Sequence, residues 1–222
     1  MNASERRLVE LHAARPGALA AALAGSGSYE RLAAAVPTGA AHVLDLGCGD
    51  GPLLPLLGPH AIGCDLSPHG RPAIRARAQA LPFATGAFDA VVSHFAFSLF
   101  DEIERVVGEL HRVLAPGGTF AAMLGGGPTA GGRDALHELL ELARDAVAAA
   151  PRFGDRRARS EAGWRALFHA EDWHAPRFER CELSVRDARS YLEASYVDLA
   201  GHAEHMRAPC RIVAWLARVQ RR

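Results

Sequence analysis

The segment VLDLGCGDG, residues 43–51, constrains the fold of this chain more than any other stretch. An apolar run ends in an acid, Asp45, and three glycines follow at a spacing of two: Gly47, Gly49 and Gly51. Glycine lets the backbone turn tightly and lets a ligand approach it closely, because no Cβ stands in the way. A glycine-rich turn directly after a buried strand is typical of doubly wound α/β sheets, which bind ligands at the carboxyl ends of their strands. The segment therefore predicts a first strand followed by a ligand-binding loop.

The remainder of the chain alternates between strand and helix patterns. Further strands are predicted at residues 60–66, 73–78, 88–95, 119–127, 177–185 and 210–219. Helices are predicted at 4–24 with a break near Pro16, 25–36, 101–118, 133–150, 161–170 and 187–206, with at most a short helix at 52–58. This alternation indicates an α/β protein with a Rossmann-like, doubly wound and mostly parallel sheet of about seven strands, preceded by N-terminal helices.

Length and composition indicate one domain in the cytoplasm. The 222 residues are 49% hydrophobic, which suits a single α/β core. We expect an N-terminal helical cap at 1–40, a ligand-binding core at 41–124, an insertion at 125–176 and a strand-helix-strand unit at 177–222. No apolar run is long enough to cross a bilayer, and the N-terminus lacks the charged-then-apolar layout of a signal peptide. The formal net charge is zero, which gives no reason to expect nucleic acid or a membrane as partner.

Several kinds of chemistry are disfavoured by the residue types. All 25 basic residues are arginines, so Schiff-base and phosphate-loop lysines are excluded. The four cysteines are scattered and form neither a disulfide ladder nor a CxxC pair. His202 and His205 are spaced to share a helix face, but no third ligand accompanies them, so no metal site is expected.

The glycine spacing favours a nucleoside over a dinucleotide. A dinucleotide fingerprint, G-x-G-x-x-G, would need its third glycine at the position of Pro52, whereas Gly51 comes one residue early. Asp65, at the end of the next predicted strand, could accept hydrogen bonds from ribose hydroxyls. A nucleoside with an amino-acid tail would need such a turn and a carboxylate for its ammonium group.

Four segments together resemble the class I S-adenosylmethionine-dependent methyltransferases, and among them the type 11 small-molecule group. They are VLDLGCGDG, GCDLS, ALPFATGAFDAVVS and ELHRVLAPGGTF, between residues 43 and about 124. The resemblance implies S-adenosylmethionine as cofactor and methyl transfer to a small molecule. The arginine- and alanine-rich, lysine-free composition suits an enzyme of specialised metabolism. We also expect a homo- or heterodimer and an antiparallel last strand. The cofactor-binding residues that it implies are Asp45, Gly47, Gly49, Asp65, Leu66, Leu81, Phe95 and Tyr29. It places His94 near the methyl group, where a neutral imidazole could act as a base.

The sequence departs from that family where adenine would bind. Residues 67–72 contain two prolines and a glycine in place of a helix, and Arg77 stands where the family has an acid that accepts the adenine amino group. An arginine only donates hydrogen bonds. In one interpretation Gln79 or a backbone carbonyl takes over. In the other the protein does not methylate: it eliminates or cyclises an anionic small molecule bound by arginines, with Arg77 and Arg133 as candidates, or it is a subunit of a heteromeric enzyme.

Three further features each have a functional and a structural interpretation. The glycines at 125–127 and 131–132 suggest either a mobile lid or a simple turn. The arginines at positions 152, 156, 157 and 159 suggest an anion site or a solvated linker. Trp164, Phe168 and Trp173 suggest a substrate wall or core packing.

Overall fold

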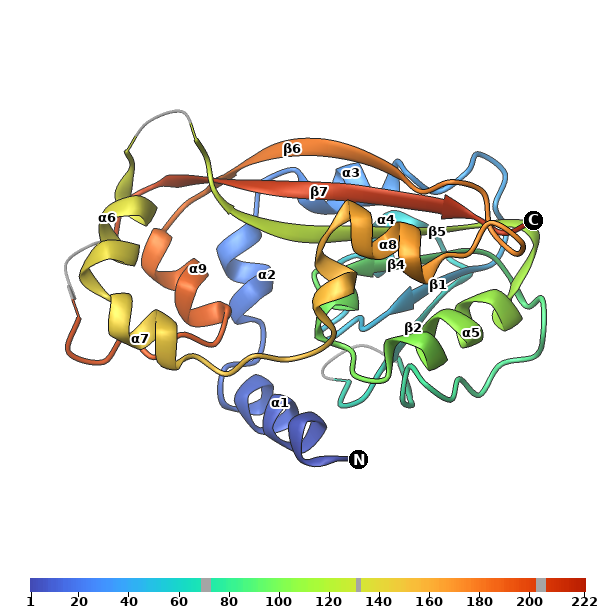
Figure 1. Cartoon of the computed structure of the whole chain (residues 1–222), viewed down its shortest axis with the longest axis horizontal. Helices are drawn as coiled ribbons and strands as arrows, with labels where there is room; N and C mark the ends of the chain where they lie inside the picture. Colours follow the sequence, from blue (N-terminus) through green and yellow to red (C-terminus); the bar gives the residue numbers. More distant parts are fainter. Residues whose placement is uncertain (69–72, 131–132, 203–206) are drawn as a thin grey trace.

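A computed structural model describes residues 1–68, 73–130, 133–202 and 207–222. Its centre is one seven-stranded sheet with the order β3-β2-β1-β4-β5-β7-β6 (Figure 1). The strands are β1 (Val43–Leu46), β2 (Ala61–Asp65), β3 (Ala73–Arg75), β4 (Phe88–His94), β5 (Leu114–Pro128), β6 (Arg177–Val185) and β7 (Cys210–Gln220). Among the strands described, β7 runs antiparallel to its neighbours β5 and β6, and the other paired strands run parallel. The predicted fold class is confirmed, including the antiparallel last strand.

Alternate residues of the central strands pack into two hydrophobic cores, one on each face of the sheet. In β1, Val43 belongs to the first core and Leu44 to the second, as expected from the two-residue period of a strand. The first core is closed by α2 (Ala18–Leu23), α3 (Ser28–Ala33), α6 (Ala135–Leu142) and α9 (Ala188–Ala194). The second is closed by α5 (Ile103–Val113) and α8 (Glu161–Leu167). Helices on both faces leave the carboxyl ends of the parallel strands as the open edge.

Local sequence explains the principal helix boundaries. In α5 the buried positions Ile103, Val106, Val107, Leu110 and Val113 follow the helical period, so one stripe faces the sheet. The first helix, α1 (Ala3–Ala14), begins with a capping box in which Asn2 and Glu5 bond to each other's backbone amides. It ends before Pro16, as predicted. The short α4 (Leu54–Leu57) carries its proline in the first turn, where the missing amide donor costs little.

Two helix predictions were too long. Residues 133–150 form two helices, α6 and α7 (Arg144–Ala149), which meet at the buried, non-helical Ala143. The helix predicted over 187–206 ends at Ala194, because Tyr196 takes a positive φ of 67° and turns the chain back toward the core. His202 therefore lies beyond the helix, and His205 lies outside the described residues.

Packing decides two interpretations of the insertion and gives partners to two of its arginines. Residues 125–127 continue β5 and pair with β7, so they are strand and not a lid; residues 131–132 lie outside the described chain. Trp164, Phe168 and Trp173 are almost fully buried in the second core, and so they are not a substrate wall. In the arginine-rich stretch, Arg157 pairs with Asp155 and Glu104, while Arg159 donates to two backbone carbonyls.

Candidate functional site

A cavity of about 720 Å³ opens at the carboxyl ends of β1, β2 and β4. One side is formed by the loop after β1 and the end of β2; we call this the loop half, and its wall includes Gly47, Gly49, Asp65, Leu66, Ala78 and Gln79. The other side is formed by α2, α3, α7 and the segment after α9; we call it the helix half, and its wall includes Leu19, Tyr29, Phe95, Ala146, Pro151 and Val197. Residues of α1 from Glu5 to Ala14 cover the cavity. Figure 1 shows α1 apart from the two helical layers, below the strand ends.

Asp45 presents a buried carboxylate to this cavity. Its side chain is 1% exposed, and its Oδ1 has no hydrogen-bond partner among the described residues. Burial, and secondly the charge of Asp65, raise the pKa of this carboxyl to about 7. A buried acceptor without a partner is costly, and a cationic donor would remove that cost. Asp45 is therefore suited to bind an ammonium group.

The glycine loop is fixed in place by the end of β2. The amides of Gly47 and Cys48 both donate to the Cys64 carbonyl, at 2.7 and 3.2 Å. The Gly49 amide donates to Asp65 Oδ2 at 3.0 Å. Gly47 has a φ of +76°, and a Cβ added there would lie 2.4 Å from the Cβ of Ala96. The loop thus requires glycine at position 47 for both conformation and space.

Asp65 is oriented by the backbone around it. Its Oδ2 accepts from Gly49, and its Oδ1 accepts from the Ser67 amide at 2.7 Å. A carboxylate oxygen can accept more than one hydrogen bond, so both oxygens keep capacity for hydroxyl donors. Asp65 lines the cavity beside the glycine loop, as a ribose-binding acid would.

His94 lies at the end of β4, between the two halves of the cavity. It is 9% exposed, its Nε2 lies 3.0 Å from Ser28 Oγ, and its ring stacks on Tyr29 with centroids 4.0 Å apart. Burial lowers the pKa of this imidazole to about 3, so it is neutral at physiological pH. A neutral imidazole can accept a hydrogen bond from a ligand, but one with so low a pKa is a weak base.

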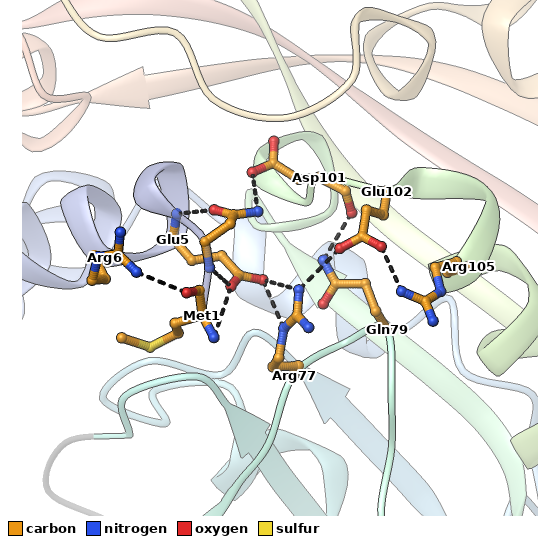
Figure 2. A network of polar contacts seen from close by, with 9 residues as sticks. Met1, Glu5, Arg6, Arg77, Gln79, Asp101, Glu102 and Arg105 are labelled. Atoms are coloured by element: carbon orange, nitrogen blue, oxygen red, sulfur yellow. Dashed lines mark hydrogen bonds and ion pairs between the residues drawn. The ribbon is translucent and has the colours of Figure 1, made fainter.

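Arg77 lines the cavity with its charge already neutralised (Figure 2). Its Nε donates to Glu5 Oε1 at 2.9 Å, and its Nη2 lies 2.8 Å from the same oxygen and 3.0 Å from Glu102 Oε1. Glu5 belongs to α1, the helix that covers the cavity. The Glu5 carboxylate is nearly buried, whereas Arg77 is about one-third exposed. The pair ties the covering helix to the segment after β3.

Glu5 and Arg77, which form this ion pair, are 72 positions apart in the sequence.

The structure brings most of the predicted site residues to this cavity. Asp45, Gly47, Gly49, Asp65, Leu66, Tyr29, His94, Phe95 and Arg77 all line it. Two predicted residues do not. Leu81 packs in the second core with its amide bonded to Glu109, and Ala78 and Gln79 form the wall instead. Arg133 is exposed and pairs with Glu141, because it precedes α6 outside the cavity.

Sequence reasoning missed the contribution of α1 and of Ser28. Glu5, Leu8 and His12 line the cavity, and Ser28 is fully buried against His94. The capping motif of Asn2 and Glu5 indicates where α1 begins, but it does not indicate that the helix covers a site.

The described ranges contain neither a candidate metal cluster nor a membrane-spanning helix. No group of three or more His, Cys, Asp or Glu side chains is placed to hold a metal ion in the part of the chain that the structure describes. No helix in the same residues is long and apolar enough to cross a membrane.

Comparison with known proteins finds similarity to methyltransferases over part of the chain. Residues 44–122 match the family model described as a methyltransferase domain. The demethylmenaquinone methyltransferase of Thermus thermophilus is 37% identical over 101 residues, which cover 37% of this chain and 46% of that protein. The malonyl-[acyl-carrier protein] O-methyltransferase of Methylococcus capsulatus is 35% identical over 99 residues, covering 44% of this chain and 34% of that protein. The chain thus spans less than half the length of these two curated relatives.

A solved structure extends the likeness of the fold to the whole chain. A methyltransferase of Thermotoga maritima, described as a possible histamine N-methyltransferase, superposes with a TM-score of 0.61 at 15% identity and covers 100% of this chain and 99% of its own. Residues 44–122 are thus similar to methyltransferase domains, and the whole chain has the same fold as this S-adenosylmethionine-dependent methyltransferase. The site fits that cofactor, because a buried acceptor without a partner, a glycine turn and an oriented carboxylate line one cavity.

Proposed function

We propose that this protein transfers a methyl group from S-adenosylmethionine to a small molecule. The observation that carries the proposal is the buried Oδ1 of Asp45, which has no partner among the described residues and faces the same cavity as Asp65. One carboxylate suits the ammonium of a methionine tail and the other suits the ribose hydroxyls. The curated relatives named above are methyltransferases, which supports the same activity.

The bound cofactor supplies an electrophilic methyl group on a positively charged sulfur. The chain's own residues bind and orient. Gly47 and Gly49 allow close approach of the methionine part, Asp65 holds the ribose, and Leu66, Ala78 and Gln79 form the wall for the base. His94 orients the acceptor group at the boundary of the two cavity halves. The α1 helix limits access of water from above. Such enzymes gain most of their rate from positioning two reactants in line.

The alternative of an enzyme that processes an anionic molecule has less support. It needs a free cation at Arg77, but this guanidinium already bonds to Glu5 and Glu102. A small-molecule substrate in specialised metabolism, and a homo- or heterodimer, remain parts of the proposal that rest on the sequence.

Titration calorimetry with S-adenosylhomocysteine tests the proposal directly. We expect a dissociation constant in the micromolar range for the wild-type protein. Asp65→Ala should weaken binding about a hundredfold, because charge-assisted hydrogen bonds to the ribose are lost. Asp145→Ala is the matched control: this acid lies on α7, is exposed and does not line the cavity. A well-folded wild-type protein that binds neither S-adenosylhomocysteine nor S-adenosylmethionine would refute the proposed function.

A further inference from the structure

The helix half of the cavity differs in chemistry from the loop half. Much of its wall is carbon: Leu19 of α2, Ala146 of α7, Pro151 and Val197 present aliphatic groups, and Tyr29 and Phe95 add rings. Of the two acids on this side, Glu193 pairs with Arg189 and Asp198 is exposed. In Figure 1 the helices α2, α6, α7 and α9 gather at one end of the molecule, away from β2 and α5. His94 is the last residue of β4, which lies next to β5 in the sheet, and it stands where the loop half meets this apolar space.

The charges around the cavity disfavour an anionic acceptor. The described lining contains seven acids and three arginines; the acids are Glu5, Asp45, Asp50, Asp65, Asp101, Glu193 and Asp198. Each of the arginines has a partner: Arg77 bonds to Glu5, Arg7 to Glu10, and Arg15 to the Glu193 carbonyl. A negatively charged molecule would therefore meet excess negative charge without a free guanidinium to bind it.

His94 also restricts the accepting group. It offers a neutral, nearly buried imidazole held between Ser28 and Tyr29. Because its low pKa makes it a weak base, it cannot readily remove the proton of an alkyl ammonium or an alcohol. It can hold a hydrogen bond from a group that is itself acidic, such as a phenol or an enol.

On the basis of the proposed function, we propose that the acceptor is an uncharged, mostly apolar molecule that occupies the helix half and presents a phenolic or enolic hydroxyl to His94. In the transfer, the hydroxyl oxygen forms a bond to the methyl carbon while the carbon–sulfur bond breaks. The electron pair of that bond stays on sulfur, and the hydroxyl proton leaves to water. Ser28, 66 positions from His94 in sequence, is then a positioning residue that fixes the imidazole.

Three probes that share a naphthalene ring test this substrate class by binding, independently of turnover. Calorimetry would compare 2-naphthol, 2-naphthoate and 2-naphthylmethylammonium, each with the protein alone and with the protein saturated with S-adenosylhomocysteine. In the protein saturated with S-adenosylhomocysteine, whose ammonium group would occupy Asp45, we expect 2-naphthol to bind at least about tenfold more tightly than either charged probe, since a charge in the helix half would be desolvated without a partner. Tighter binding of the carboxylate or the ammonium, or no binding of 2-naphthol to protein that binds S-adenosylhomocysteine, would overturn the inference.

Matched variants locate the binding site. Ala146→Phe fills the helix half and should abolish 2-naphthol binding, whereas Ala148→Phe, on the same helix but outside the cavity lining, should leave it unchanged. His94→Ala should weaken 2-naphthol binding about tenfold, and His94→Gln, which keeps an acceptor, should weaken it less. Equal binding by Ala146→Phe and wild type would contradict the assigned site. If S-adenosylhomocysteine does not bind but the protein alone binds 2-naphthol, the proposed function fails and the assigned pocket stands.

Discussion

The two halves of the cavity are built in different ways. The loop half is fixed by backbone hydrogen bonds between adjacent parallel strands, such as those from Gly47 and Cys48 to the Cys64 carbonyl. The helix half and the cover depend on helices joined to the body by side chains, as in the Glu5–Arg77 pair (Figure 2). Under the proposed function, the sheet binds the cofactor, whereas the helices select the acceptor and limit the exchange of ligands.

The largest expected effect comes from adding one methyl group to the loop half. Gly47→Ala should destabilise the protein by about 3 kcal/mol, because the new Cβ clashes with Ala96 and the residue keeps a positive φ. Gly39→Ala is the control: it also has a positive φ, of +89°, but its Cβ would meet nothing within 4 Å. It should cost only about 1 kcal/mol. Urea unfolding measures both values, and equal losses would show that the loop half is not tightly packed.

A smaller effect is expected from the pH dependence of Asp45. Its pKa of about 7 means that the carboxyl gains its charge only as the pH rises through neutrality. Binding of the ammonium tail of S-adenosylhomocysteine should therefore strengthen about tenfold per pH unit from 5 to 7. Calorimetry at several pH values measures this slope, and Asp45→Asn should remove it. A wild-type affinity independent of pH would show that Asp45 does not contact the ammonium group.

The same carboxyl affects stability in the opposite sense. In the folded protein its pKa lies above the ordinary value of 3.8, so the folded state holds this proton more tightly than the unfolded chain does. The ligand-free protein should accordingly lose stability as the pH rises from about 4 to about 7, and the loss should be absent in Asp45→Asn.

The smallest effect is expected from loosening the cover. Arg77→Ala removes the partner of the nearly buried Glu5 carboxylate, and S-adenosylhomocysteine should dissociate several-fold faster as α1 opens more often. Arg105→Ala is the matched control, because Arg105 also pairs with Glu102 but is exposed and lies outside the cavity lining. Its dissociation rate should stay within about twofold of wild type, as expected for a surface ion pair. Stopped-flow measurements compare the dissociation rates of S-adenosylhomocysteine from the two variants. Identical rates would show that the Glu5–Arg77 pair does not hold α1 over the cavity.

Prediction from the sequence succeeded where a signal is local. The strand at 177–185 was predicted with its observed bounds, since its apolar and polar residues alternate and turns flank it. The helix predicted over 187–206 failed because propensity continued past Ala194, whereas burial of Val197 and Leu199 turns the chain inward. Leu81 was placed beside the adenine by resemblance, but it packs in the second core.

The sequence by itself determined the sheet and the loop half of the site. The two-residue and 3.6-residue periods assign strands and helices, and the glycines with Asp45 and Asp65 mark a ligand loop, because these signals lie within a few neighbouring residues. Only the tertiary structure decided the cover and the helix half. The Glu5–Arg77 and Ser28–His94 contacts join residues 72 and 66 positions apart, so they exist only once the sheet has brought distant helices to one edge. That same folding neutralises Arg77, which in the sequence alone is a candidate anion-binding residue.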